Sequence, residues 1–121
     1  MIKTKSIIDP AEETDGIRVL VSRYWPRGVS EADLIISSWM RELAPSKELL
    51  QDWRNSQISW QEYSGRYREE MSSCGEAIQN LANKAARTAV TLLCHEPEHN
   101  PHCHRHILRH LIEAELNREA E

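Results

Sequence analysis

The sequence predicts an α/β fold, with a small, mostly parallel sheet of about three strands covered by helices. Three short stretches are rich in apolar and β-branched residues, as strands are. The second and third of them are apolar on both faces, which is typical of strands covered on both sides. The longer segments between and after them carry apolar residues at helical spacing. The order strand, strand, helices, strand, helix indicates a layered α/β domain.

The predicted strands are "IKTKSII" (2–8), "IRVLVSRYW" (17–25) and "TAVTLLC" (88–94). The first alternates until "DPAEETDG" breaks it with proline and glycine. In the second, Val19 and Val21 share one face and Leu20 takes the other, as expected of a central strand. The third is a near-continuous apolar run, which favours a buried strand.

Helices are expected in the remaining segments. Ser30 and Asp33 resemble a capping box, and apolar residues then recur at helical spacing until Pro45, which predicts one helix across this segment. These apolar residues are Leu34, Ile35, Trp39 and Leu43. Further helices are expected after Ser46 and Ser59, with Gly75 breaking or bending the second run. A terminal amphipathic helix follows from Ile107, Leu108, Leu111 and Ile112.

Composition narrows the class of protein. A chain of 121 residues is most simply one domain, 1–121. Its net charge of −4 argues against a general nucleic-acid binder. No apolar stretch is long enough to cross a bilayer and the first residues lack a signal-peptide core, so we expect a cytoplasmic protein without a membrane partner. In that compartment Cys74, Cys94 and Cys103 are expected to be reduced. The oligomeric state stays open.

Two motif-bearing segments follow predicted strands. The second strand leads into Ser22–Gly28 and the third into Cys94–Arg105, where all six histidines of the chain lie between His95 and His110. In an open α/β sheet, ligands bind beyond the carboxyl ends of the strands. We therefore expect these two segments to be neighbours at one edge of the sheet.

Together these segments predict a site for a small ligand bearing phosphate or carboxylate. Guanidinium groups and helix N-termini both favour anions. Proton transfer near neutral pH is the ordinary chemistry of histidine. The candidate catalytic residues are Cys94, His95 and His104, and the candidate ligand-binding residues are Arg23, Trp25, Arg27, Cys103 and Arg105. The alternative is structural: the arginines pair with acidic side chains and loop carbonyls, and Trp25 packs in the core.

Metal binding by the Cys/His-rich segment 94–106 is a second hypothesis, and a non-catalytic interaction module is a third. The side chains suit zinc, but the tight ligand pairs of a structural zinc site are mostly lacking. Helix register turns Cys103 inward with Ile107 and Leu111, and leaves His102, His106 and His110 on another face toward solvent. We therefore expect no bound metal, and no cofactor, since a glycine-rich nucleotide loop is also absent.

Cys94 itself has two interpretations. At the end of a strand, near arginines and a helix start, it could be a thiolate nucleophile of lowered pKa. A phosphatase-like loop is disfavoured, because the segment lacks glycine and Arg105 lies eleven residues further on. The alternative is a small buried side chain packed against Cys103.

Several motifs resemble the YeaO-like branch of domain-of-unknown-function family 488. They are "RVLVSRYWPRGVS", "WMRELAPS", "WQEYSGRYREEM" and "VTLLCHEPEHNPHCHRHIL", which together span nearly the whole chain. The resemblance implies an α/β fold with a small, mostly parallel sheet and supplies no established reaction. Two departures are visible: Ser22 stands where members usually carry aspartate, and "WRNSQISW" lacks a histidine often found before its second tryptophan.

Overall fold

The computed structural model describes residues 1–120, with side chains described as far as Arg118. Four strands form one sheet in the order β1-β4-β2-β3, and every pair is parallel. Their bounds are Ile2–Ser6 for β1, Ile17–Leu20 for β2, Ser38–Trp39 for β3 and Val90–Cys94 for β4. The predicted α/β class is confirmed, and the sheet has one short edge strand more than expected.

Five α-helices surround the sheet: α1 (Glu31–Leu34), α2 (Lys47–Arg54), α3 (Trp60–Met71), α4 (Gly75–Ala85) and α5 (His104–Ala120). Single 3-10 turns occupy Glu13–Asp15, Arg41–Leu43 and Ser72–Cys74. The predicted caps are confirmed, because the Ser46 and Ser59 hydroxyls accept hydrogen bonds from the backbone N–H groups of Leu49 and Glu62. None of the helices in the described part combines the length and apolar character needed to cross a membrane.

The predicted helix between Ser30 and Pro45 is wrong. Helix α1 ends after one turn, at Ile35, whose backbone is left-handed (φ 52°, ψ 68°). The chain then becomes the edge strand β3, held by hydrogen bonds from the Ser37 N–H to the Arg18 carbonyl (2.7 Å) and from the Met40 N–H to the Leu20 carbonyl (2.8 Å). Backbone pairing with β2 therefore overrides the helical spacing of the apolar residues.

The second strand is shorter than predicted. It ends at Leu20 rather than continuing to residue 25, although the Val21 N–H still donates to the Leu93 carbonyl (3.0 Å). The Ser22 hydroxyl then donates to the Tyr24 carbonyl (2.8 Å), which closes a turn. This turn ends the pairing with β4 and leaves the Tyr24 carbonyl 3.0 Å from His95 Nε2.

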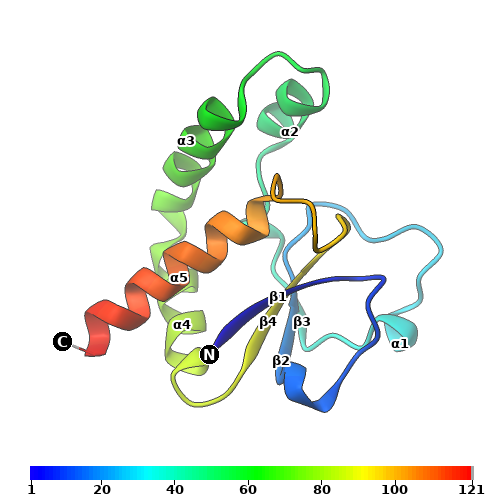
Figure 1. Cartoon of the computed structure of the whole chain (residues 1–121), viewed down its shortest axis with the longest axis vertical. Helices are drawn as coiled ribbons and strands as arrows, with labels where there is room; N and C mark the ends of the chain where they lie inside the picture. The colour runs from blue at the N-terminus through cyan, green and yellow to red at the C-terminus, as the bar shows by residue number, and fades with distance from the viewer. Residues whose placement is uncertain (121) are drawn as a thin grey trace.

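The two faces of the sheet are covered unequally. On one face, Val19, Val21 and Leu92 join a large core with residues of α2, α3, α4 and α5. On the other, Leu20 and Leu93 form a small cluster with Leu34 of α1 and partly buried loop residues. Figure 1 shows α3, α4 and α5 on one side of the sheet and α1 on the other. The predicted opposite facing of Val19 and Leu20 is confirmed.

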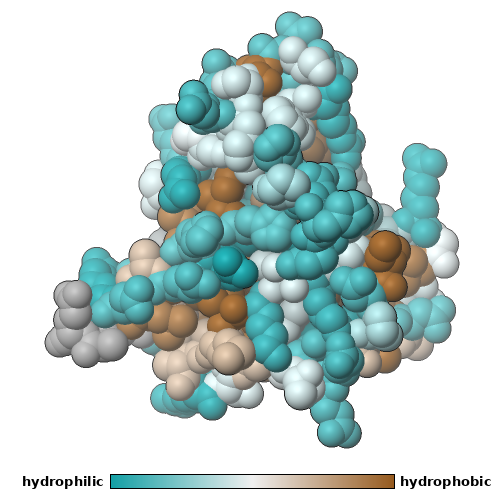
Figure 2. All heavy atoms as spheres, viewed as in Figure 1, coloured by the Kyte–Doolittle hydropathy of each residue, from teal (hydrophilic) through white to brown (hydrophobic). Residues whose placement is uncertain are grey.

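The carboxyl ends of β2 and β4 lie side by side, since Leu20 pairs with Leu93. From this point the chain after β2 turns toward the β3 edge, whereas the chain after β4 leads into α5. Such divergence between neighbouring parallel strands opens a crevice where α/β proteins bind ligands. The space-filling view of Figure 2 shows that the surface over α5 is largely hydrophilic.

Candidate functional site

A pocket of about 880 Å³ opens at the carboxyl ends of β2 and β4. It is lined by Ser22, Arg23, Tyr24, Trp25, Arg27, Pro45, Leu50, Trp53, Arg54, Tyr63, Cys94, His95, Glu96, His102, Cys103 and His104. His95 Nε2 lies 3.0 Å from the Tyr24 carbonyl, and His104 Nε2 lies 2.8 Å from that of Val21. The prediction that the Ser22–Gly28 and Cys94–Arg105 segments are neighbours is confirmed.

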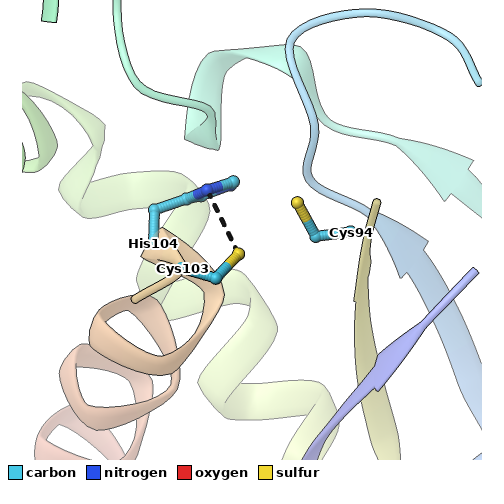
Figure 3. A group of neighbouring side chains, drawn as sticks. All are labelled: Cys94, Cys103 and His104. Atoms are coloured by element: carbon cyan, nitrogen blue, oxygen red, sulfur yellow. Dashed lines mark hydrogen bonds between the residues drawn. The ribbon is translucent and has the colours of Figure 1, made fainter. Parts of the chain in front are cut away.

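Cys94, Cys103 and His104 form a buried group in this pocket, which we call the Cys–His cluster. Cys94 ends β4, Cys103 immediately precedes α5, and His104 is the first residue of that helix. One donor atom from each lies within 4.8 Å of the others, and all three residues are buried. Figure 3 shows both sulfurs and the imidazole facing a common space between the strand end and the helix start.

The orientation of His104 is fixed on both sides of its ring. Because Nε2 faces the Val21 carbonyl at 2.8 Å, we assign the ring proton to Nε2, where it donates to that oxygen. Nδ1 then carries the lone pair and lies 3.8 Å from the Cys103 sulfur. The ring also packs edge-on against Tyr67, whose hydroxyl donates to the Leu43 carbonyl (2.7 Å). The imidazole therefore presents an acceptor nitrogen to the two thiols.

The two thiols of the Cys–His cluster differ in acidity. A hydrogen bond from the Cys103 thiol holds the pKa of Cys94 well below its usual value, against the opposing effect of burial. The Glu96 N–H and Arg105 lower the Cys94 pKa further. The same hydrogen bond, together with burial, raises the pKa of Cys103. Cys94 is therefore the more acidic thiol of the pair, and Cys103 donates the hydrogen bond to it.

Three arginines line the pocket without a carboxylate or carbonyl partner for their guanidinium groups among the described residues. Arg23 lies over the Tyr24 ring at 5.9 Å, and its buried Nε has no hydrogen-bond partner in the described part of the chain. Arg27 and Arg54 are exposed at the rim. The sequence predicted Arg23 and Arg27 as ligand-binding residues, but it did not predict Arg54. Only the fold brings α2, which carries Arg54, to the pocket.

Arg105 lies elsewhere than expected. Its side chain is fully buried, does not line the pocket, and donates to the carbonyls of Glu96 (2.7 Å) and Pro97 (2.8 Å). Longer contacts reach the Lys5 and Cys94 carbonyls, and Glu98 forms an ion pair with it at 3.3 Å. Arg105 thus stabilises the loop after β4. Its positive charge also lowers the pKa of Cys94, although its side chain does not line the pocket. For Arg105, therefore, the structural alternative holds, in which an arginine pairs with acidic side chains and loop carbonyls.

Aromatic side chains form a second wall of the pocket. Trp53 of α2 packs against Tyr63 of α3 with ring centroids 5.4 Å apart, and both line the pocket. Trp60 stacks on Tyr63 (4.9 Å) and on His102 (4.7 Å). Trp25 is half-buried, and its indole N–H donates to the Val29 carbonyl (2.6 Å). Trp25 therefore both packs against its own loop and lines the pocket.

The remaining histidines lie outside the Cys–His cluster. His110 is exposed, as the helix register predicted, and Cys103 is buried, also as predicted. His102 is exposed but stacks on Trp60 rather than extending freely into solvent. His106 is half-buried, with Nε2 3.1 Å from the Asn100 carbonyl, and burial lowers its pKa, with Arg105 adding to the effect. The solvent-facing prediction is therefore wrong for His106.

Comparisons with known proteins show which family the chain resembles. A family model described as "Active DUF488-N3 subclade" matches residues 2–116. The chain is 35% identical to the uncharacterized protein YeaO of Escherichia coli (strain K12) over 92 residues, which cover 76% of this chain and 80% of that protein. It is 30% identical over 96 residues to the uncharacterized protein Rv3073c of Mycobacterium tuberculosis (strain ATCC 25618 / H37Rv), covering 78% and 81%. No solved structure matches the chain.

Proposed function

This chain belongs to the YeaO-like branch of domain-of-unknown-function family 488, and on that premise we propose that it binds a small ligand carrying a phosphate or carboxylate group. The ligand's anionic group lies between the pocket arginines, and the rest of the ligand reaches the Cys–His cluster. The proposal covers the chemical class of the ligand and the position in which it is held.

The observation that carries this proposal is the set of three guanidinium groups left without carboxylate or carbonyl partners at one pocket. The structural alternative requires Arg23 and Arg27 to pair with acidic side chains or loop carbonyls, and neither does so among the described residues. Guanidinium groups are strong donors to planar and tetrahedral oxyanions, and of the three only Arg23 has a buried nitrogen. Among the residues that the structure describes, Glu96 is the one carboxylate that lines the pocket, and it accepts a hydrogen bond from Asn100 (3.1 Å).

The dimensions and walls of the pocket fit a metabolite rather than a polymer. Pockets that bind small molecules typically measure about 300–1,000 Å³, and this one, at about 880 Å³, lies in that range. Trp53 and Tyr63 offer flat apolar surface next to the arginines, which favours a ligand with an apolar or planar part. A cytoplasmic location would supply phosphorylated and carboxylated metabolites and keep the thiols reduced.

For catalysis, we propose the residues at the inner end of the pocket. His104 is buried and fixed by the Val21 carbonyl, whereas His95 is exposed at the rim. A ligand held by Arg23 would share the pocket with both imidazoles and with Cys94. Such a position suits general acid–base catalysis by histidine near neutral pH.

Isothermal titration calorimetry with inorganic phosphate, citrate and a sugar phosphate, at low salt, tests the proposal. Arg23→Met and Arg27→Met keep an apolar stem and remove the charge. Each substitution should weaken binding by about tenfold or more, because a hydrogen bond to a charged group contributes about 1.5–3 kcal/mol. Higher salt should weaken binding by the unsubstituted protein as well.

Arg87→Met is the matched control, since Arg87 is exposed before β4, at the opposite end of the sheet. It should bind the probes as the unsubstituted protein does. Equal affinity in the Arg23 and Arg27 variants would show that these arginines are structural. Loss of binding in the Arg87 variant alone would place the anion at the wrong end of the sheet, and would overturn the proposal.

A further inference from the structure

The Cys–His cluster has the composition and convergence of a metal site. Two sulfurs and one imidazole nitrogen lie within 4.8 Å of one another, and no carboxylate belongs to the group. Sulfur and imidazole ligands select zinc and other borderline or soft metals, whereas magnesium and calcium require oxygen ligands. The donor set therefore restricts the ion to the zinc type.

The histidine of the cluster is held as a metal ligand is held. Metal-binding histidines usually donate their second ring N–H to a carboxylate or backbone carbonyl, which fixes the tautomer and the ring orientation. Here Nε2 lies 2.8 Å from the Val21 carbonyl, so Nδ1 faces Cys103 and the common space with its lone pair. Figure 3 shows this nitrogen and both sulfurs directed toward the same space.

Charge balance also favours a divalent ion. Two thiolates and a neutral imidazole around Zn²⁺ sum to zero net charge, which suits three residues that are each no more than 6% exposed. Burying an uncompensated charge is costly, so a neutral complex is the stable form at such a position. The cluster joins the end of β4 to the start of α5, and both elements are held by the large core.

We propose that Cys94, Cys103 and His104 bind one zinc ion, with a fourth coordination position open to the pocket. Catalytic zinc sites have three protein ligands, Cys2His among the known sets, and leave the fourth position to water or substrate. All three residues line the pocket, so the open position faces the space between the arginines and the aromatic wall. Bound zinc would supply Lewis acidity at that position. The metal site stands independently of the proposed anion site, but with zinc bound His104 would be a ligand and not the acid–base catalyst.

The test uses untagged protein, reconstituted with zinc or with cobalt and then desalted. We expect one zinc per chain by elemental analysis. The cobalt form should show thiolate-to-metal charge-transfer absorption, with ligand-field bands of tetrahedral intensity. Cys94→Ser, Cys103→Ser and His104→Ala should each weaken metal binding at least tenfold in competition with a chromogenic chelator, and the two serine variants should reduce the charge-transfer band.

Two substitutions serve as controls. Cys74→Ser removes a half-buried thiol beside α4, and His110→Ala removes an exposed imidazole from α5. Both variants should keep one zinc and the full cobalt spectrum. Circular dichroism establishes folding of every variant, and the cobalt spectrum of the unsubstituted protein decides the question even where a cluster variant fails to fold.

Three outcomes would overturn the zinc site. They are a protein without stoichiometric metal, cobalt bound without thiolate absorption, and metal lost in the His110 variant while the cluster variants retain it. The first outcome, with rapid alkylation of Cys94, would instead favour a free thiolate nucleophile. Arg23→Met should retain zinc in all cases. Failure of anion binding and failure of metal binding are therefore distinguished by different variants and different signals.

Discussion

Asp15 is a buried carboxylate held between two cations. It accepts hydrogen bonds from Arg18 (2.6 Å), Lys5 (3.0 Å) and the Glu12 N–H (3.0 Å), with 4% of its side chain exposed. Burial alone would raise its pKa, but the three hydrogen bonds outweigh burial, and the pKa of Asp15 lies below its ordinary value. This group therefore stabilises the fold above the ordinary aspartate pKa, and its contribution disappears as the pH falls through the folded-state pKa.

Asp15→Asn tests this linkage. At neutral pH the substitution should lower the free energy of unfolding by about 3 kcal/mol, because it leaves the buried Arg18 without its anion. The stability of the variant should also fall less steeply than that of the unsubstituted protein between roughly pH 5 and pH 2. Urea denaturation across this pH range measures both effects. Asp33→Asn, at an exposed position on α1, should change neither; a similar loss there would disprove the assignment to Asp15.

At the scale of single elements, α1 shows what the sequence could and could not predict. The caps of α2 and α3 were predicted correctly, because a serine hydroxyl and the N–H three residues on are a local interaction. The strand pairing of Ser38–Trp39 was not, because its partner β2 lies nearly twenty residues earlier. Non-local backbone pairing ended a helix that the spacing of Leu34 and Trp39 predicted.

The site divides in the same way. The carboxyl ends of parallel strands meet at one edge of a sheet. The sequence could therefore place Arg23, Cys94 and His104 together. It could not predict that the 94–103 loop folds back to bring both cysteines to one imidazole, because this depends on the buried Arg105 and its carbonyl partners. Metal binding was ranked low from ligand spacing, which describes local pairs and not ligands joined by a folded loop.

Replacing Ile35 at the end of α1 should stabilise the protein. Ile35 has a left-handed backbone (φ 52°) and is 57% exposed, so its branched side chain brings strain and little burial. Ile35→Gly should raise the free energy of unfolding by about 1 kcal/mol, since the left-handed conformation costs a side-chain-bearing residue about 1–2 kcal/mol. Chemical denaturation measures the change. Ile8→Gly, exposed but without positive φ, should give no gain; equal effects in both variants would argue against strain at Ile35.

At the scale of the whole molecule, the sheet has one thick covering layer and one thin layer. Leu92 and Leu93 are adjacent on β4 and both fully buried, yet they face the large and the small cluster respectively. In the large cluster the sheet is covered by helices that pack on one another, whereas in the small one it is covered by Leu34 of α1 and loop residues beside Trp39 of β3. The thin layer should therefore adjust more readily to a loss of volume.

The pair Leu92→Ala and Leu93→Ala measures this asymmetry with identical chemistry. Both should destabilise the protein within the range of about 2–5 kcal/mol that such core truncations cost, and Leu92→Ala should lie nearer its upper end. Thermal and urea denaturation give the two free energies. Equal costs, or a greater cost for Leu93→Ala, would mean that the loop layer is packed as rigidly as the helical layer.

The position of Arg105 bears on which residues of the pocket can be substituted without loss of the fold. Its guanidinium holds the carbonyls of Glu96 and Pro97 next to the helix turn that carries Cys103 and His104. The Cys–His cluster is thus anchored to a strand and a helix, while the rim of the pocket belongs to loops and to exposed positions such as Arg27 and Arg54. On the proposed function, exchange of rim residues would alter which ligand is admitted without disturbing Cys94, Cys103 and His104. A library randomised at those two rim positions should accordingly yield folded proteins with new ligand preferences.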